Sequence, residues 1–217
     1  MINMAYIELK NVSKKVKNDY LLNNISLEIE QGTINGFVGE NGSGKTMLFR
    51  AILGFIKTDG EIKISGQRIK LNSEMPVNVG TIIETPGFIN SYTGLKNLEY
   101  LAAIKNLVDR EQIIDAMRVF GMDKHRDTKV KKYSLGMRQK LAIIQSYMEN
   151  QELLVLDEPT NGLDDEAVEI FKRKMKSLAS EGKTVLIASH DREVINDLAD
   201  TIYRVKNGTV SEMRDLE

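Results

Sequence analysis

The sequence contains no cysteine and no tryptophan, and only three prolines among its 217 residues. Without cysteine there can be neither a disulfide framework nor a thiolate metal site. No apolar run approaches the roughly 18 residues that a membrane-spanning helix requires. The amino-terminal segment also lacks the basic stretch and apolar core of a signal peptide. These absences predict one large intracellular domain, residues 1–217.

The sequence also lacks an excess of charge of either sign. Lys and Arg together number 30, Asp and Glu number 31, and the net charge is −1. Nucleic-acid-binding domains usually carry a clear basic excess. The basic cluster at residues 124–132 is interrupted by Asp127, and such a charge run is usually a solvated face. We therefore expect no nucleic-acid partner, and we expect His125, within this cluster, to lie at the surface.

What the sequence does have is a phosphate-binding loop. Residues 39–46 fit the pattern G-x-x-x-x-G-K-[ST], between an apolar strand-like run at 33–38 and a helical pattern from Met47. Glycines let the backbone wrap a phosphate, and successive N–H groups at the start of a helix attract anions. Lys45 adds a charge for the terminal phosphates, and Thr46 offers a hydroxyl to Mg²⁺. The residues predicted to bind the nucleotide here are Gly39, Glu40, Asn41, Gly42, Ser43, Gly44, Lys45, Thr46 and Met47.

Strand patterns surround this loop at both ends of the chain. Residues 5–10 and 25–29 alternate apolar with polar side chains, and turn signals precede a further strand at 61–64. These predict an antiparallel sheet beside the nucleotide strand. Continuous apolar runs at 79–83, 153–156 and 184–188 are typical of strands buried on both faces of a parallel sheet. A helix at 164–180 would connect the last two, and Asn207-Gly208 predicts a closing hairpin over 200–213.

The middle of the chain differs, because residues 93–148 show only helical periodicity. We therefore expect an α/β fold of the P-loop NTPase class, with a mostly parallel core sheet, an amino-terminal antiparallel β subdomain and an inserted α-helical subdomain. In this division residues 1–84 and 151–217 form the catalytic lobe, and residues 85–150 form the helical subdomain.

Chemically useful side chains follow the two later parallel strands. Ligands bind at the carboxyl ends of such strands. Asp157 comes at the end of one and is suited to hold Mg²⁺ through water, and Glu158 after it is suited to act as the general base. His190 follows the other strand and is a candidate sensor of the γ-phosphate.

The segment 133–141, Tyr-Ser-Leu-Gly-Met-Arg-Gln-Lys-Leu, resembles the LSGGQ-R-Q-x-L signature of ABC (ATP-binding cassette) transporter ATPases. Ser134 is a good N-cap, and Gly136 keeps the helix start bare, which suits an anion. The resemblance covers nearly the whole chain, since residues 161–164 resemble the D-loop, ending in Asp164, and His190 matches the switch histidine. It implies that Ser134, Gly136 and Met137 act in trans, on nucleotide held by another subunit.

The same resemblance implies a mechanism and partners. Two cassettes would close head-to-tail around two MgATP and reopen on hydrolysis, driving an integral membrane permease on a separate chain. The second cassette would be a copy of this chain or a paralogue, ATP and Mg²⁺ would be the cofactors, and the protein would sit in the cytoplasm against the inner face of the membrane.

Three departures from the general family pattern are informative. Val16 aligns with the aromatic residue that stacks on adenine, with Tyr20 as a nearby substitute. Glu84 aligns with the Q-loop glutamine and, as a carboxylate, is a stronger Mg²⁺ ligand. Together with Leu135 and Met137 in the signature, Glu84 makes the chain similar to ATPases of bacitracin- and lantibiotic-type peptide exporters and immunity transporters. Export of an antimicrobial peptide or another amphipathic compound is the function that this similarity implies.

Four points stay open at this stage. Phe88, Tyr92 and Tyr100 are candidate apolar anchors for the permease, although they suit the core of the helical subdomain equally well. A soluble ABC ATPase acting on ribosomes or nucleic acid is the alternative function. A cassette that binds ATP without hydrolysing it is a second alternative, which the presence of Glu158 and His190 disfavours. Nothing in the residues themselves distinguishes import from export.

Overall fold

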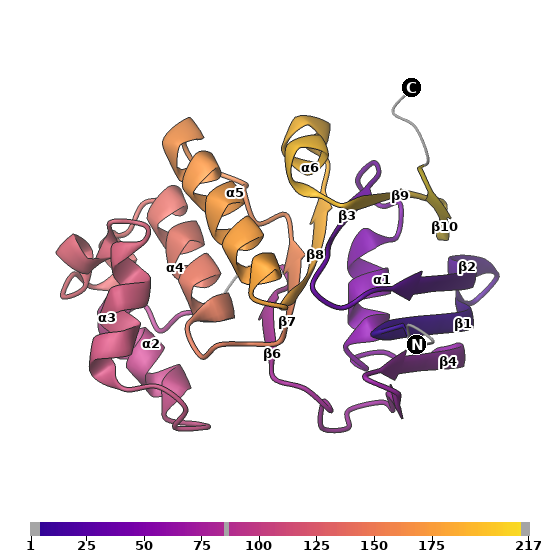
Figure 1. Cartoon of the computed structure of the whole chain (residues 1–217), viewed down its shortest axis with the longest axis horizontal. Coiled ribbons are helices and arrows are strands. Elements are labelled where there is room, and N and C mark those ends of the chain that lie inside the picture. The colour runs from indigo at the N-terminus through magenta and orange to yellow at the C-terminus, as the bar shows by residue number, and fades with distance from the viewer. Residues whose placement is uncertain (1–4, 85–86, 214–217) are drawn as a thin grey trace.

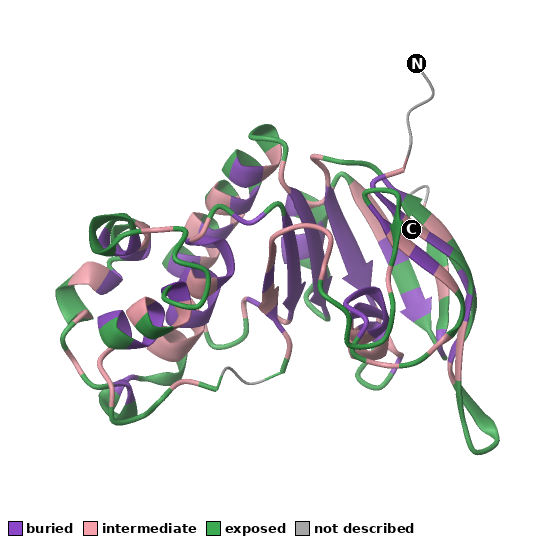
Figure 2. Cartoon of the chain, turned by 90° about the horizontal axis from the view of Figure 1, so that it is seen from below, coloured by how far each residue is buried: buried purple, intermediate pink, exposed green. Residues whose placement is uncertain are grey.

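A computed structural model describes residues 5–84 and 87–213, and its centre is a six-stranded sheet. The strand order is β10 (Thr209–Glu212), β9 (Thr201–Lys206), β3 (Ile34–Val38), β8 (Thr184–Ser189), β7 (Leu153–Asp157) and β6 (Val79–Ile82). All neighbours pair in parallel except β10 with β9. The strands β3, β7 and β8 are buried at every position, as Figure 2 shows in purple, which explains why their sequences are mostly apolar. The predicted mostly parallel core is therefore confirmed.

A second, antiparallel sheet has the order β2 (Asp19–Ile29), β1 (Ile7–Val16), β4 (Asp59–Ile64) and β5 (Gln67–Arg68). The first two strands are longer than the alternation predicted. The pairing of β1 with β2 shifts register after Leu9, and Asn11 there has a φ of 51°. Such bulges break the period of two while the strand continues, so the sequence pattern ended too early.

Helices occupy the rest of the chain. The segment between β6 and β7 contains α2 (Gly94–Ala102), α3 (Arg110–Arg118), the short 3₁₀ helices η1 (Met122–His125) and η2 (Val130–Lys132), and α4 (Leu135–Tyr147). Among residues 87–152 the only β pairing is one isolated bridge between Thr93 and Lys129. The helical content predicted for this segment is present; the exact boundaries proposed for the two subdomains stay a prediction.

The core sheet separates two apolar clusters, and alternate residues of its strands point to opposite faces. Leu154, Leu156 and Ile187 pack with helices α2 to α5. Their neighbours Leu153 and Val155 pack with the antiparallel sheet and with α1 (Lys45–Ile52). Figure 1 shows the result, with the helices α2 to α5 on one side of β7 and β8, and α1 with the strands β1, β2 and β4 on the other.

Three helices begin directly after parallel strands. The helix α1 follows β3, α5 (Asp165–Ser180) follows β7, and α6 (Arg192–Leu198) follows β8. Because these strands run in the same direction, the three helices begin at one edge of the sheet. Every residue predicted from the strand ends therefore lies at this edge.

Candidate nucleotide site

The loop between β3 and α1 has the conformation of an anion cradle. Gly42 and Gly44 have φ angles of 80° and 114°, in the region that favours glycine. Gly44 is the N-cap of α1, and no side chain caps that helix, so its first N–H groups stay available. The loop is braced from the far end of the chain, because Gly208 in the β9–β10 turn donates its N–H to the Ser43 carbonyl at 2.9 Å.

Lys45 supplies the positive charge of this loop. Its side chain is only 6% exposed. The Nζ atom donates to the carbonyl oxygens of Gly39 at 2.6 Å and Glu40 at 3.2 Å. An ammonium group has three protons. The lysine is thus held against the loop by two of them, with a third for a phosphate oxygen.

Thr46 and Asp157 meet directly, as the sequence predicted for two residues at one metal site. The Thr46 hydroxyl donates to the Asp157 carboxylate, with Oγ1 and Oδ2 2.5 Å apart. Burial raises the pKa of Asp157, and the hydrogen bond from Thr46 opposes that rise. A divalent cation would compensate this poorly hydrated carboxylate, which therefore fits Mg²⁺. Bound there by Thr46 and Asp157, Mg²⁺ would neutralise charge on the phosphates.

Glu158 lies at the centre of the edge, in a left-handed conformation with a φ of 50°. Its N–H donates to the Ala188 carbonyl at the end of β8, at 2.8 Å. One carboxylate oxygen, Oε2, is 2.8 Å from Nδ1 of His190. The other, Oε1, is buried without a hydrogen-bond partner among the described residues and lies 3.8 Å from Lys45 Nζ. The predicted base and sensor therefore contact each other, and one carboxylate oxygen of Glu158 keeps its capacity to accept a hydrogen bond.

Residues 40–47 of the phosphate loop, Asp157 and Glu158 line one cavity of about 550 Å³, a size that suits a small-molecule ligand. His190 contacts Glu158 but does not belong to this lining. The lining also includes Tyr20, named from the sequence as a substitute for Val16, and Leu21, Asn207 and Gly208, which the sequence did not assign to the site. Val16 does not belong to that lining; it ends β1, paired with Asp19. The half-exposed ring of Tyr20 lies at the cavity instead, with Lys15 over it.

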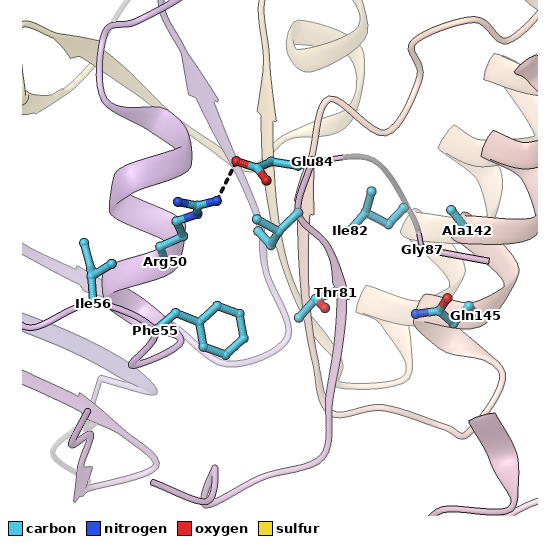
Figure 3. Close-up of a pocket in the computed structure, with 10 residues that line it drawn as sticks. Arg50, Phe55, Ile56, Thr81, Ile82, Glu84, Gly87, Ala142 and Gln145 are labelled. Carbon is cyan, nitrogen blue, oxygen red and sulfur yellow. Dashed lines mark hydrogen bonds and ion pairs between the residues drawn. The ribbon is translucent and has the colours of Figure 1, made fainter. Parts of the chain in front are cut away.

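The predicted metal ligand Glu84 is held by another residue. Its carboxylate is 2.5 Å from the guanidinium of Arg50, as Figure 3 shows, and its side chain is 63% exposed. Arg50 lies one helical turn after Thr46 on α1, so the residue that holds Glu84 is a neighbour of the residue that contacts Asp157. The negative charge of Glu84 therefore adds to the effect of burial in raising the pKa of Asp157. Metal binding by Glu84, which stays a prediction, would have to use the carboxylate oxygen that does not contact Arg50 or replace that ion pair.

No group of three or more His, Cys, Asp or Glu side chains suited to a metal ion occurs among residues 5–84 and 87–213. Mg²⁺ usually binds one or two protein oxygens together with substrate phosphates and water. Thr46 and Asp157 therefore match its ordinary mode of binding in a nucleotide site.

The signature residues form a second helix start, away from the cavity. Ser134 caps α4 by accepting a hydrogen bond from the N–H of Met137 at 3.2 Å. Gly136 faces the D-loop so closely that a Cβ atom would lie 2.8 Å from the Gly162 carbonyl oxygen. Asp164 caps α5 by accepting from Ala167 at 2.8 Å. The signature and the D-loop therefore form one continuous surface.

Gln139 connects this surface to the catalytic edge. Its side-chain amide donates to the Pro159 carbonyl at 2.8 Å, one residue after Glu158. No role for Gln139 was predicted, because a glutamine inside a helix carries no local signal of a contact with a distant strand end.

Comparison with known proteins gives the family. A family profile described as "ABC transporter" matches residues 22–161. This range contains the phosphate loop, the signature segment and the Asp157-Glu158 pair. The chain belongs to the ABC transporter ATP-binding family. It is an ABC ATPase, as the sequence predicted.

Several ABC ATP-binding proteins are similar to this chain along nearly its whole length. "Uncharacterized ABC transporter ATP-binding protein YybJ" of Bacillus subtilis is 39% identical over 203 residues, covering 93% of each chain. "Bacitracin transport ATP-binding protein BcrA" of Enterococcus faecalis is 37% identical, covering 98% of this chain and 70% of its own length. "Lantibiotic transport ATP-binding protein SrtF" of Streptococcus pyogenes is 30% identical, covering 94% and 88%. The predicted kinship with this subgroup is confirmed.

Solved structures agree on the fold. The dimeric bacterial ABC transporter cassette MJ0796 has a TM-score of 0.84 at 25% identity, covering 97% of this chain and 100% of its own. A dimeric post-hydrolysis state of the same cassette, bound to ADP and Pi, has a TM-score of 0.85 at 24% identity, with the same coverage. The described residues of the present chain form no helix long and apolar enough to cross a bilayer.

Proposed function

We propose that this chain binds MgATP in a head-to-tail dimer and hydrolyses it to drive a separate membrane permease. The cargo would be an antimicrobial peptide or another amphipathic compound, moved outward. The protein would then work in the cytoplasm, on the inner face of the membrane, through that permease. The relatives described as bacitracin and lantibiotic transport ATP-binding proteins support the choice of cargo.

One observation carries the catalytic part of this proposal. Glu158 contacts His190 through one oxygen, and its other oxygen, buried and unpartnered among the described residues, faces Lys45 at 3.8 Å. A carboxylate fixed beside the phosphate loop in this way suits a base that removes a proton from water. The positive Lys45 and the imidazole of His190 would stabilise charge on the γ-phosphate oxygens.

The dimer is supported by the division of the site between two surfaces. The cavity at the phosphate loop has Lys45, Thr46, Asp157 and Glu158 on its walls but none of the signature residues. The exposed start of α4, at Ser134 and Leu135, has the free N–H groups of an anion site. Two copies arranged head-to-tail would complete both sites at once.

A permease surface is supported by a second cavity of about 470 Å³, between α1, β6 and α4 (Figure 3). Phe55, an exposed aromatic ring, lines it with Arg50 and Gln145. The anchors predicted from sequence lie elsewhere: Phe88 packs against the helical core, and Tyr92 meets Tyr100 edge-to-face at 6.4 Å. We propose Phe55 as the principal apolar anchor.

The test is affinity capture of tagged Glu158→Gln protein from detergent-solubilised source cells, with MgATP. This variant keeps the shape of the side chain but lacks the base, so it should trap the closed dimer and retain its permease. A multi-span membrane protein should co-purify, and Phe55→Glu in the same background should lose it while binding ATP normally. The matched control is Val119→Glu, which changes an exposed apolar residue at the end of α3. Recovery of ribosomes or nucleic acid without a membrane protein would overturn the transport proposal in favour of the soluble alternative.

A further inference from the structure

We propose that the working dimer is a homodimer whose two copies are aligned by ion pairs. The pairs would join a basic cavity beside the phosphate loop of one copy to Asp165 and Glu166 at the start of α5 in the other. This inference rests on the head-to-tail arrangement proposed above, and it names the partner as a second copy of this chain.

The basic cavity has a volume of about 300 Å³ and shares the phosphate loop with the nucleotide cavity. Arg192, Arg204 and Lys206 line it from α6 and β9. Arg204 and Lys206 point outward because they alternate along β9 with the buried residues Tyr203 and Val205. The cavity carries a net positive charge, because Glu40 is the only carboxylate among its lining residues. All of these lining residues lie in the part of the chain that the structure describes.

These three cations have no charge partner within the chain. Among the described residues, none of their side chains forms an ion pair, and none donates a hydrogen bond to another side chain or to a carbonyl, although salt bridges occur throughout the rest of the surface. Three like charges gathered around one cavity repel one another weakly in water, and an anionic partner would relieve that repulsion.

The acidic segment is also unpaired. Asp165 and Glu166 lie exposed in the first turn of α5, and no ion pair joins either to another described residue. Asp164 beside them differs, because it caps the helix and lies 3.4 Å from the ammonium of Lys140. The two outer carboxylates are therefore the ones available to another molecule.

The fold places the two surfaces where a head-to-tail dimer would join them. The signature helix and the D-loop form one surface, since Gly136 lies against Gly162. Asp165 follows the D-loop directly. If the signature of one copy faces the phosphate loop of the other, the first turn of α5 arrives beside that loop. The basic cavity lies there, lined by residues 38–43 of the same loop.

The pairing selects a second copy because both halves are on one chain. A two-fold axis would form the contact twice, with each copy giving one basic and one acidic surface. A paralogous cassette would match only if it carried both charge sets. Because these charges are exposed, we expect their ion pairs to set the relative orientation of the two copies and to speed their association. The attraction between the charges should weaken as salt concentration rises.

The experiment swaps the charges in the Glu158→Gln background and measures dimerisation with MgATP by light scattering after size exclusion. The first version carries Arg192→Glu, Arg204→Glu and Lys206→Glu; the second carries Asp165→Lys and Glu166→Lys. Each version alone brings like charges together at both contacts, so its dimer should weaken by about tenfold or more. An equimolar mixture should recover the dimer as a heterodimer, because both of its contacts then join opposite charges.

Two controls make the result specific. Glu28→Lys with Glu30→Lys makes the same charge change as the second version on exposed β2-side positions, and it should dimerise like the parent. Arg192→Glu alone is the change farthest in sequence from the β9–β10 turn, which braces the phosphate loop. It should still weaken the dimer and be rescued by the second version. This single variant therefore controls for any loss of nucleotide binding in the triple variant.

The outcomes separate the two proposals. If the parent protein and the charge-reversed versions all form dimers equally well, the ion pairing is overturned, while the head-to-tail dimer stands. If the charge-reversed versions dimerise weakly and form no heterodimer when mixed, the pairing is also overturned, since the two charged surfaces would then not contact each other. A parent that stays monomeric with MgATP at every concentration would overturn the head-to-tail dimer itself.

Discussion

Two helices of this ATPase begin with exposed N–H groups, and only one of them is a complete phosphate site. At the start of α1 the N-cap is Gly44, no side chain caps the helix, and Lys45 and Thr46 follow at once. At the start of α4, Ser134 takes one N–H for its own cap, and the next residue is the exposed Leu135. The comparison shows that a bare helix start attracts anions, whereas catalysis needs a cation, a metal position and a base beside it.

The difference between the two starts has a spatial cause. The helix α1 follows a core strand, so the ends of β7 and β8 bring Asp157, Glu158 and His190 to it. The helix α4 follows the irregular segment around η2, and Gly136 in its first turn faces the D-loop. We therefore propose that this helix start serves a phosphate that another subunit holds. Four substitutions test this contrast.

Removing the charge at α1 should have the largest effect. Lys45→Met keeps the buried aliphatic stem but deletes the ammonium, and losing a charged hydrogen bond of about 3 kcal/mol should weaken ATP binding by about 100-fold. Titration calorimetry with MgATP would measure this. Lys124→Met, an exposed lysine in η1, should bind ATP normally; equal losses in both variants would contradict the assignment.

Removing the partner of Glu158 should separate catalysis from binding. His190→Ala should lower the rate of ATP hydrolysis by about 100-fold, the usual cost of losing one group that stabilises transition-state charge. ATP affinity should change little, because the imidazole is exposed beside Glu158 and has no contact with the phosphate loop in this structure. Phosphate release assays would check this, with His125→Ala as the control. Unchanged hydrolysis in His190→Ala would exclude the sensor role.

Removing the N-cap of α4 should lower ATP hydrolysis by the dimer without changing ATP binding by the monomer. Ser134→Ala should cost about 1 kcal/mol of folding stability. Hydrolysis should fall by about tenfold through a lost contact to the nucleotide in trans, while ATP binding to the monomer stays normal.

The chain offers a matched control for this effect. Thr93 caps α2 in the same way, by accepting from the N–H of Lys96 at 3.1 Å. Thr93→Ala should lose similar stability in a thermal melt and keep its hydrolysis rate. If both variants lost hydrolysis equally, the effect of Ser134→Ala would be one of stability alone.

The smallest expected effect concerns adenine. Tyr20→Ala should weaken ATP binding by about fivefold through the loss of one aromatic contact. It should also lower the ratio of the affinity for ATP to the affinity for GTP. Val16→Ala should leave both unchanged, because Val16 lies outside the cavity lining. Calorimetry on both nucleotides would measure this, and a larger loss in Val16→Ala than in Tyr20→Ala would restore the original assignment.

The core of the fold was predictable because burial leaves a direct mark on sequence. Strands such as β7 are buried at every position and apolar up to the final Asp157, and the phosphate loop has a fixed spacing. The carboxylates and histidine at the strand ends could be assigned because parallel strands align their carboxyl ends. These parts of the site depend on local pattern plus one general rule of topology.

The remainder of the site depended on contacts that leave no local pattern. Tyr20, named from the sequence only as a substitute for Val16, reaches the cavity because β1 and β2 form a long bulged hairpin, and the bulges hide the period that would have favoured it over Val16. Gln139 reaches Pro159 from another element, and Phe55 reaches its cavity from the segment after α1. The Arg50–Glu84 pair likewise joins elements that only the folded sheet brings together.

The brace between Gly208 and Ser43 has a consequence for folding, because it joins the phosphate loop to a turn that lies far from it in the sequence. Contacts between distant parts of a chain form late in folding, because the intervening loop must first be closed. We therefore expect the phosphate loop to reach its braced conformation only after β9 has paired with β3 in the core sheet. Full ATP affinity would then report that the core sheet is assembled, as well as that the loop itself is intact.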